Sequence, residues 1–236
     1  GMGGAARMAG EAALRVGAGL VSLAVHPRNI HLNAERPELM VHGAEHPDDL
    51  RPLLERATVM ALGPGLGRAA WSEGLWHRAL EADLPMVVDA DGLNLLARYP
   101  LKREDWILTP HPGEAARLLG VSVDEVQGDR FAAVGAIQDR YGGTCILKGA
   151  GTLIASSQLS LCPFGNPGMA SGGMGDVLTG VIAGLWAQGL EGPAEQGVCL
   201  HALAGDRAAE AGERGLLALD LMPFLRSLAN AHRTAF

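Results

Sequence analysis

The sequence has no run rich in lysine and arginine, and its 236 residues carry a formal net charge of −7. A nucleic-acid surface needs a basic patch, so we expect no nucleic-acid partner. We also find no signal peptide and no uninterrupted apolar stretch of membrane-spanning length. These absences predict a cytoplasmic protein without a membrane partner.

Cysteine is scarce and forms no motif. Cys145, Cys162 and Cys199 are widely spaced, with no CxxC and no Cys/His cluster of zinc spacing. We therefore interpret them as buried apolar thiols in a reducing compartment. Internal repeats and low-complexity tracts are absent as well.

Glycine, in contrast, is abundant, at 33 of 236 residues, and it clusters in short runs beside apolar segments. This placement predicts tight loops where backbone approaches a ligand. Apolar runs predict strands at 19–25, 38–42, 58–62, 85–92, 106–109 and 144–149, with a hairpin over 152–162. Helical patterns occupy 5–16, 48–57, 71–81, 113–119, 129–140 and most of the chain after 176. Alternating strands and helices predict one α/β domain with a largely parallel sheet.

The strongest motif is NPGMASGGMGD at 166–176, which runs directly into an apolar helix. Its glycines allow several amide groups to point at one spot, and the helix N-terminus adds a positive dipole end. This combination predicts an anion site. Asp176 lies in the first helical turn, where it would accept a proton from an attacking hydroxyl. The alternative interpretation is an ordinary helix start with an acidic dipole partner.

Four weaker motifs also follow predicted strands, where open α/β sheets bind ligands. TPHPGE (109–114) is either a helix cap or part of a site. KGAGT (148–152) suits phosphates but is not a Walker A motif, and GPGLG (63–67) matches GxGxxG only loosely. In DADG (89–92) we favour a capping role for Asp91 over a water-mediated contact with Mg²⁺.

Together with the opening GAARMAGEAALRVGAGLV, these strings resemble the ADP/ATP-dependent NAD(P)H-hydrate dehydratase family over nearly the whole chain. The resemblance implies a ribokinase-like, three-layer α/β/α fold over a single domain, 1–236. It also implies phosphorylation of the ring hydroxyl of (S)-NAD(P)H hydrate, followed by loss of phosphate, with Mg²⁺ present. ADP is the donor expected for bacterial members and ATP for eukaryotic ones.

The resemblance also implies roles for individual residues. Asp176 is the expected base, and the amides of Gly173 and Gly175 would stabilise the transferring phosphoryl group. The expected nucleotide contacts are Lys148, Gly149, Ala150, Gly151, Thr152 and Gly175. The expected substrate contacts are Ala5, Gly67, His111 and Asp176. Glu114 would reach a metal through water or phosphate, although His111 replaces the asparagine of related vitamin kinases.

Further expectations concern the assembly. Folds of this class place a strand before a glycine turn such as GMGGA, so we expect the first strand to be missing here. The chain is then a stand-alone enzyme or the excised half of a bifunctional epimerase/dehydratase. Family members are often tetrameric, which implies a homo-oligomer.

Three alternatives remain open from the sequence. The first is a hydroxyethylthiazole or hydroxymethylpyrimidine kinase, which shares the glycine-then-aspartate anion site. The second is a nucleotide-binding module that has lost catalysis. The third, a nicotinamide dehydrogenase, predicts a full GxGxxG motif with an acidic residue about 20 residues later, and this pattern is absent.

Overall fold

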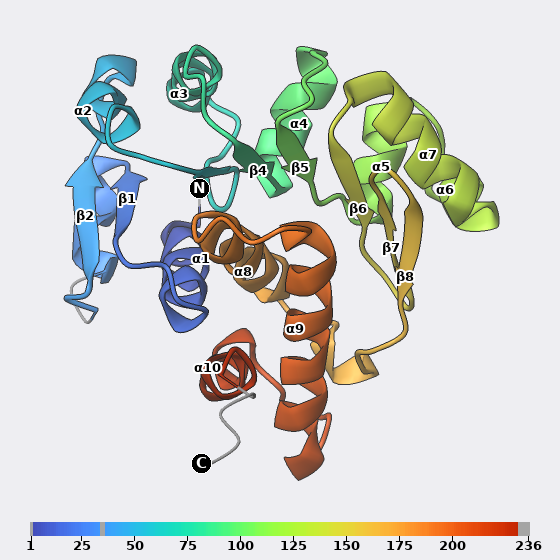
Figure 1. Ribbon diagram of the computed structural model, residues 1–236. Helices are drawn as coiled ribbons and strands as arrows, with labels where there is room; N and C mark the ends of the chain where they lie inside the picture. The colour runs from blue at the N-terminus through green and yellow to red at the C-terminus, as the bar shows by residue number, and fades with distance from the viewer. Residues whose placement is uncertain (1, 34–35, 231–236) are drawn as a thin grey trace.

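The computed structural model describes residues 2–33 and 36–230, and within them six strands form one sheet in chain order (Figure 1). The first four strands pair parallel to one another. The fourth then pairs antiparallel with the fifth, and the fifth antiparallel with the sixth. They are β3 (Met60–Leu62), β4 (Met86–Val88), β5 (Trp106–Leu108), β6 (Thr144–Leu147), β7 (Thr152–Ala155) and β8 (Leu159–Cys162). The largely parallel sheet and the terminal hairpin confirm the prediction from the sequence.

Two further strands, both predicted from the sequence, form a small parallel sheet of their own, and that separation was not predicted. They are β1 (Val21–Val25) and β2 (Leu39–Gly43), which pair in register from Val21 with Leu39. A 3-10 helix over Pro27–Asn33 makes the start of the connection between them.

The handedness of the strand connections decides which face of the sheet each helix covers. Because β3 to β6 advance across the sheet in one direction, right-handed crossovers place all their connecting helices on one face. These are α3 (Ala70–Leu80), α4 (Ala90–Arg98), α5 (Pro112–Leu119), α6 (Val123–Gly128) and α7 (Arg130–Tyr141). The opposite face is covered by α1 (Gly3–Arg15), α8 (Met174–Trp186) and α9 (Pro193–Ala208), with α10 (Met222–Leu228) outside them (Figure 1). The three-layer α/β/α prediction is confirmed.

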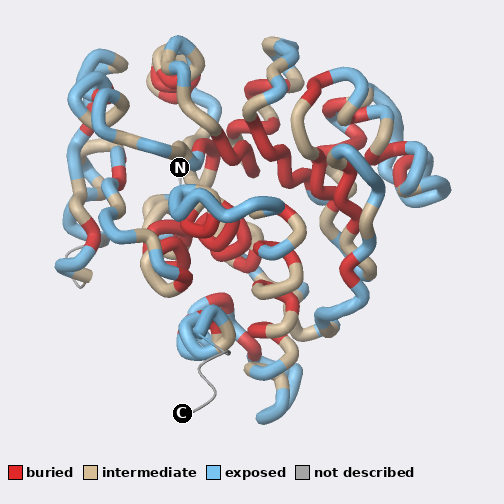
Figure 2. Tube along the Cα trace, in the orientation of Figure 1, coloured by how far each residue is buried: buried red, intermediate tan, exposed pale blue. Residues whose placement is uncertain are grey.

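Side chains alternate between the two cores along each central strand. Val87, Ile107 and Ile146 pack toward α8 and α9, whereas their strand neighbours pack toward α3 to α7. Figure 2 shows the central strands buried along their length. Burial on both faces explains why these strands are continuous apolar runs in the sequence. Of the cysteines, Cys145 and Cys162 are buried, Cys199 is partly buried, and all three are free thiols.

Helices α1 and α8 approach each other closely because small residues line their contact. A side chain at Gly180 of α8 would overlap the backbone of Ala9 in α1, and one at Gly184 would meet Ala13. None of the described helices is long and apolar enough to cross a bilayer. The close packing at Gly180 and Gly184 joins α1 to α8, the helix whose first turn carries Asp176.

The predicted helix over 48–57 is interrupted. The structure has a 3-10 helix over Pro47–Leu50 followed by the single turn α2 (Arg51–Leu54). Pro52 has no amide hydrogen to donate to the carbonyl four residues earlier, so a continuous α-helix does not form there. Helices α4 and α6 were also not predicted. The strand expected over 85–92 ends at Val88, and α4 begins at Ala90. Ser122 caps α6 by accepting the Glu125 amide at 3.1 Å.

Candidate active site at the carboxyl edge of the sheet

The carboxyl ends of three parallel strands bring polar residues to one edge of the sheet. Asp89 follows β4, Thr109 follows β5 and Lys148 follows β6. Parallel strands all end at the same edge, so these side chains converge although they are far apart in sequence. The N-terminal part of α8 reaches the same edge, because Thr179 in its second turn donates a hydrogen bond to Asp89 at 2.9 Å.

Asp89 is the most deeply buried carboxylate of this group, at 2% exposure. Its Oδ1 accepts a hydrogen bond from the Lys148 Nζ at 2.7 Å, and its Oδ2 accepts the Thr179 hydroxyl. Burial by itself would raise the pKa of Asp89, but the Lys148 charge and the hydrogen bonds from Lys148, Thr109 and Thr179 lower it. Asp89 is therefore a buried anion.

The Lys148 ammonium lies between two carboxylates. Besides Asp89, it faces Glu114, whose Oε2 lies 3.9 Å from Nζ. Burial alone would lower the pKa of Lys148, but the charges of Asp89 and Glu114 raise it. The side chain thus stays cationic at neutral pH, in a place where a phosphate could approach it.

The glycine-rich segment leads into α8 through a left-handed glycine. Gly173, the N-cap of α8, has a φ of 93°, in the region that favours glycine. A methyl group at Gly175 would lie 3.1 Å from the Lys148 Nζ and 3.3 Å from the Asp89 Oδ2. Amides in the first turn of a helix have no acceptor within the helix, so they are available to an anion beside Lys148.

Asp176 is partly buried in this first turn. Burial and the Asp89 charge raise its pKa to about 6, and Lys148 opposes them. A carboxylate with this pKa is well matched to accept a proton near neutral pH. The position and chemistry of Asp176 fit the predicted base.

His111 and Glu114 form a capping box at the start of α5. The His111 Nδ1 accepts the Gly113 amide at 3.0 Å, and the Glu114 Oε2 accepts the His111 amide at 2.8 Å. Burial and the nearby Lys148 charge lower the pKa of His111, and burial raises that of Glu114. The capping interpretation of TPHPGE is therefore correct, and the imidazole is still exposed to a substrate.

Asp91 does not cap its helix as predicted. Its Oδ2 accepts the Gly67 amide at 2.8 Å and its Oδ1 accepts the Asn94 amide at 3.2 Å, so it joins α4 to the GPGLG loop. Ala90, between Asp89 and Asp91, has a φ of 48°, an uncommon conformation for a residue with a side chain. On either side of this residue, Asp89 pairs with Lys148 and Asp91 binds the Gly67 amide.

The expected substrate contacts are close to one another in the structure. The GPGLG loop lies against the start of α1, where a methyl group at Gly65 would be 3.2 Å from the Ala5 Cβ. Gly67, in the same loop, donates its amide to Asp91, which lies two residues after Asp89 in the chain. Ala5 and the loop that carries Gly67 are therefore neighbours, and Asp91 connects that loop to the segment that carries Asp89.

Several residues that position the two glycine loops were missed by the sequence reasoning. Arg130 donates to the Ala150 carbonyl at 2.6 Å and holds the KGAGT loop. Asp206 accepts the Gly165 amide at 3.0 Å and the Asn166 side-chain amide at 2.9 Å. Neither residue belongs to a motif, so no local signal marked it. The Thr152 hydroxyl bonds to Gly149 within its own loop.

A metal bound by protein ligands does not fit this site. Among residues 2–33 and 36–230, no group of three histidine, cysteine, aspartate or glutamate side chains is arranged to hold a metal ion. The carboxylates of Asp89 and Glu114 already face Lys148. We therefore derive no chemical step from a resident metal.

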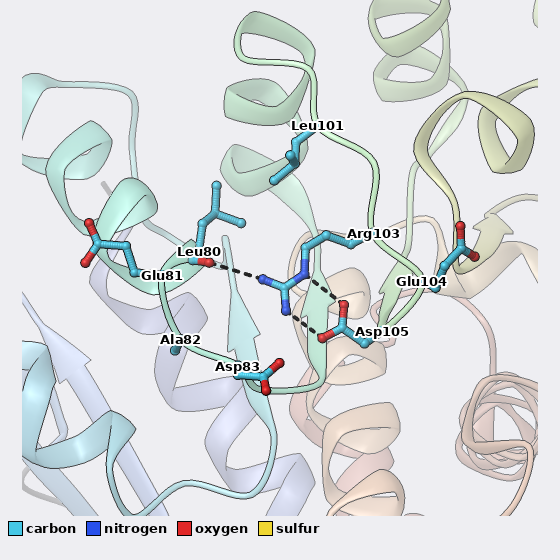
Figure 3. Close-up of a pocket in the computed structure, with 8 residues that line it drawn as sticks. All are labelled: Leu80, Glu81, Ala82, Asp83, Leu101, Arg103, Glu104 and Asp105. Atoms are coloured by element: carbon cyan, nitrogen blue, oxygen red, sulfur yellow. Dashed lines mark hydrogen bonds and ion pairs between the residues drawn. The ribbon is translucent and has the colours of Figure 1, made fainter.

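Two depressions, of about 590 and 550 Å³, lie at the opposite edge of the sheet, where the strands begin. Figure 3 shows the first, in which Arg103 and Asp105 pair with each other, Nε to Oδ1 at 2.8 Å. Arg103 also donates to the Leu80 carbonyl at 3.3 Å. Because these groups satisfy one another, we interpret the depression as structural.

The chain is similar to known proteins in both sequence and fold. The sequence profile of the NAD(P)H-hydrate dehydratase family matches residues 1–226. The bifunctional NAD(P)H-hydrate repair enzyme Nnr of Coxiella burnetii is 58% identical over 98% of this chain. Only 48% of that relative is covered, so the chain spans about half the length of the bifunctional proteins it matches.

Two shorter proteins match over most of their length. The ADP-dependent (S)-NAD(P)H-hydrate dehydratase of Neisseria meningitidis is 38% identical, over 98% of this chain and 82% of its own. The ADP/ATP-dependent NAD(P)H-hydrate dehydratase of Bacillus subtilis, co-crystallised with ATP/Mg²⁺, has a TM-score of 0.83 and 30% identity. That match covers 98% of this chain and 85% of the Bacillus chain.

Proposed function

The chain belongs to the NAD(P)H-hydrate dehydratase family, and we propose that it regenerates NADH or NADPH from the S-hydrate by nucleotide-dependent dehydration. The observation that carries the proposal is the placement of Asp176 in the first turn of α8. There a proton acceptor stands beside helix amides and the Lys148 ammonium. Phosphoryl transfer to a hydroxyl needs this combination.

The reaction would proceed in two stages. Asp176 accepts the proton of the hydrate's ring hydroxyl as that oxygen attacks the terminal phosphorus of the nucleotide, releasing the shortened nucleotide. The phosphate then leaves the ring carbon, a ring proton is lost, and the double bond is restored. With ADP as donor, the products are AMP, inorganic phosphate and NAD(P)H, so the atoms balance.

The surrounding residues would orient the two substrates and stabilise the transferring phosphoryl group. The amides of Gly173 and Gly175 face the transferring phosphoryl group, where fixed dipoles lower the energy of developing charge. The KGAGT loop, Lys148, Gly149, Ala150, Gly151 and Thr152, would hold the AMP part of the donor. Ala5, Gly67 and His111 would contact the hydrated dinucleotide from the adjoining loops.

We infer the phosphoryl donor from a relative, and the metal from the negative charge of the nucleotide phosphates. The Neisseria relative is named as ADP-dependent, which supports ADP as donor. Mg²⁺ would enter with the nucleotide phosphates as part of that substrate, with Glu114 reaching it only through water or phosphate. We further propose a cytoplasmic homo-oligomer, to be tested by light scattering; a monomer at micromolar concentration would contradict the assembly.

The deciding assay mixes chemically hydrated NADH with Mg²⁺ and either ADP or ATP and follows the absorbance of restored NADH. Asp176→Asn should lower turnover by about 10²-fold or more while nucleotide binding persists. Asp124→Asn is a matched control, since Asp124 is an exposed acid in the first turn of α6. Near-normal turnover of Asp176→Asn would remove Asp176 from the mechanism.

The assay also separates the alternative functions. Recovery of NADH excludes a module that binds nucleotide without catalysis. No recovery with either nucleotide, in protein that still binds AMP, would favour a kinase for a vitamin precursor such as hydroxyethylthiazole. The sequence identity to dehydratases disfavours that kinase.

A further inference from the structure

Asp89 has no assigned role in the reaction described above, yet it is held more completely than any neighbouring carboxylate of the site. At 2% exposure, both of its side-chain oxygens accept hydrogen bonds, from Lys148 and from Thr179. An ionised carboxylate is costly to bury unless it is paired in this way. The fold therefore maintains a charge here at some expense.

The backbone around Asp89 holds it as firmly as its side-chain partners do. Its carbonyl accepts the Gly92 amide at 2.9 Å, and it lies so close to Gly63 that any side chain there would overlap it. Ala90, the next residue, adopts a φ of 48°. Such a conformation persists only where the surrounding structure determines it, and such sites are often functional.

The ion pair determines where the Lys148 ammonium can lie. Lysine is a flexible side chain, and among the described residues the only other carboxylate that forms an ion pair with its Nζ is Glu114, at 3.9 Å. The hydrogen bond to Asp89, at 2.7 Å, places Nζ directly beneath Gly175. The absence of a side chain at Gly175 leaves this charge open toward the first turn of α8.

We propose that Asp89 is a positioning residue: its carboxylate holds the Lys148 ammonium beneath Gly175 and tunes the ability of Asp176 to accept a proton. The proposal rests on the proposed function only for its catalytic consequence. The arrangement of charges that it describes exists in the protein without ligands.

The charged groups that face Asp176 come from three other parts of the fold. Asp89 at the end of β4 and Asp91 in α4 raise the pKa of Asp176, as does burial, whereas Lys148 after β6 lowers it. Replacing Asp89 by a neutral residue removes a raising charge and leaves Lys148 unopposed. Replacing Lys148 removes the lowering charge. The two substitutions therefore act in opposite directions.

The test measures the ionisation of Asp176 directly, by carbon NMR of protein labelled at the aspartate side-chain carboxyl. Asp176→Asn assigns the signal, whose midpoint is expected near pH 6 in the unaltered protein. Asp89→Asn should lower this midpoint by about one pH unit, and Lys148→Met should raise it. The exposed Asp124→Asn should leave it unchanged. An unmoved midpoint in Asp89→Asn, or one that rises, overturns the proposal.

A second readout links the charges to catalysis. In the NADH-recovery assay, Asp89→Asn should lower kcat by about 10²-fold, the scale of a misplaced catalytic group, and shift the acid limb of the pH profile to lower pH. If the NMR midpoints move as expected but no variant or parent recovers NADH, the proposed function fails and the positioning role stands. Should Asp89→Asn not fold, Lys148→Met decides alone, and a midpoint that stays or falls overturns the proposal.

Discussion

The contact between α1 and α8 predicts opposite effects for the same substitution at two helical glycines. Gly180 of α8 and Gly135 of α7 are both interior helix positions. A methyl group at Gly135 would have no atom within 4 Å, whereas one at Gly180 would overlap the backbone of Ala9. Helix propensity therefore favours alanine over glycine at both positions, whereas packing opposes alanine at Gly180 alone.

The magnitudes follow from these surroundings. Alanine gains about 0.5–1 kcal/mol over glycine inside a helix, and Gly135→Ala should realise this gain. At Gly180 the three nearest atoms are all backbone atoms of Ala9, so no side-chain rotation can relieve the overlap. Because the overlap is with backbone, the cost should fall in the upper part of the usual overpacking range, at about 2–3 kcal/mol. Once the helix gain of about 1 kcal/mol is subtracted, the net loss should be about 1–2 kcal/mol.

Thermal unfolding followed by circular dichroism measures both outcomes. For a chain of this size, 1 kcal/mol corresponds to about 2–4 °C in Tm. Gly135→Ala should therefore raise Tm by about 1–4 °C, and Gly180→Ala should lower it by about 2–8 °C. Because α8 carries Asp176, Gly180→Ala should also lower turnover. The reasoning is refuted if Gly180→Ala is as stable as the parent protein or more stable.

Three further predictions concern the site. Turnover should increase with pH through about 6, because Asp176 must lose its proton before it can accept one; an acid limb at the ordinary carboxyl pKa of about 4 would contradict this. Asp206→Ala removes two acceptor contacts from the loop at Asn166, at about 1 kcal/mol each, and should weaken AMP binding by up to about 30-fold by calorimetry. Arg130→Met frees the Ala150 carbonyl and should likewise raise the Kd for AMP with a smaller change in kcat; unchanged affinity in either variant would show that these contacts do not shape the nucleotide loops.

Much of the fold could be predicted because the relevant signals are local. The apolar run before Asp89 and the glycine after Leu119 mark the end of β4 and the end of α5, where Gly120 has a φ of 76°. The interruption near Pro52 was missed because the pattern of leucines outweighed the missing amide hydrogen. The division of the strands into two sheets was missed because periodicity does not encode which strands pair.

The features on which the proposed anion site before α8 depends were determined by the sequence itself. Glycines at 173 and 175 and an acid at 176 set the backbone conformation, the free amides and the proton acceptor within one short segment. The partners of that segment were decided only by the tertiary structure. Asp89 meets Lys148 across 59 positions and Thr179 across 90, and Asp91 binds Gly67 instead of capping its own helix. The physical reason is that the residue type alone fixes the charge of a side chain. The partner of that charge depends on which strand ends the folded sheet places side by side.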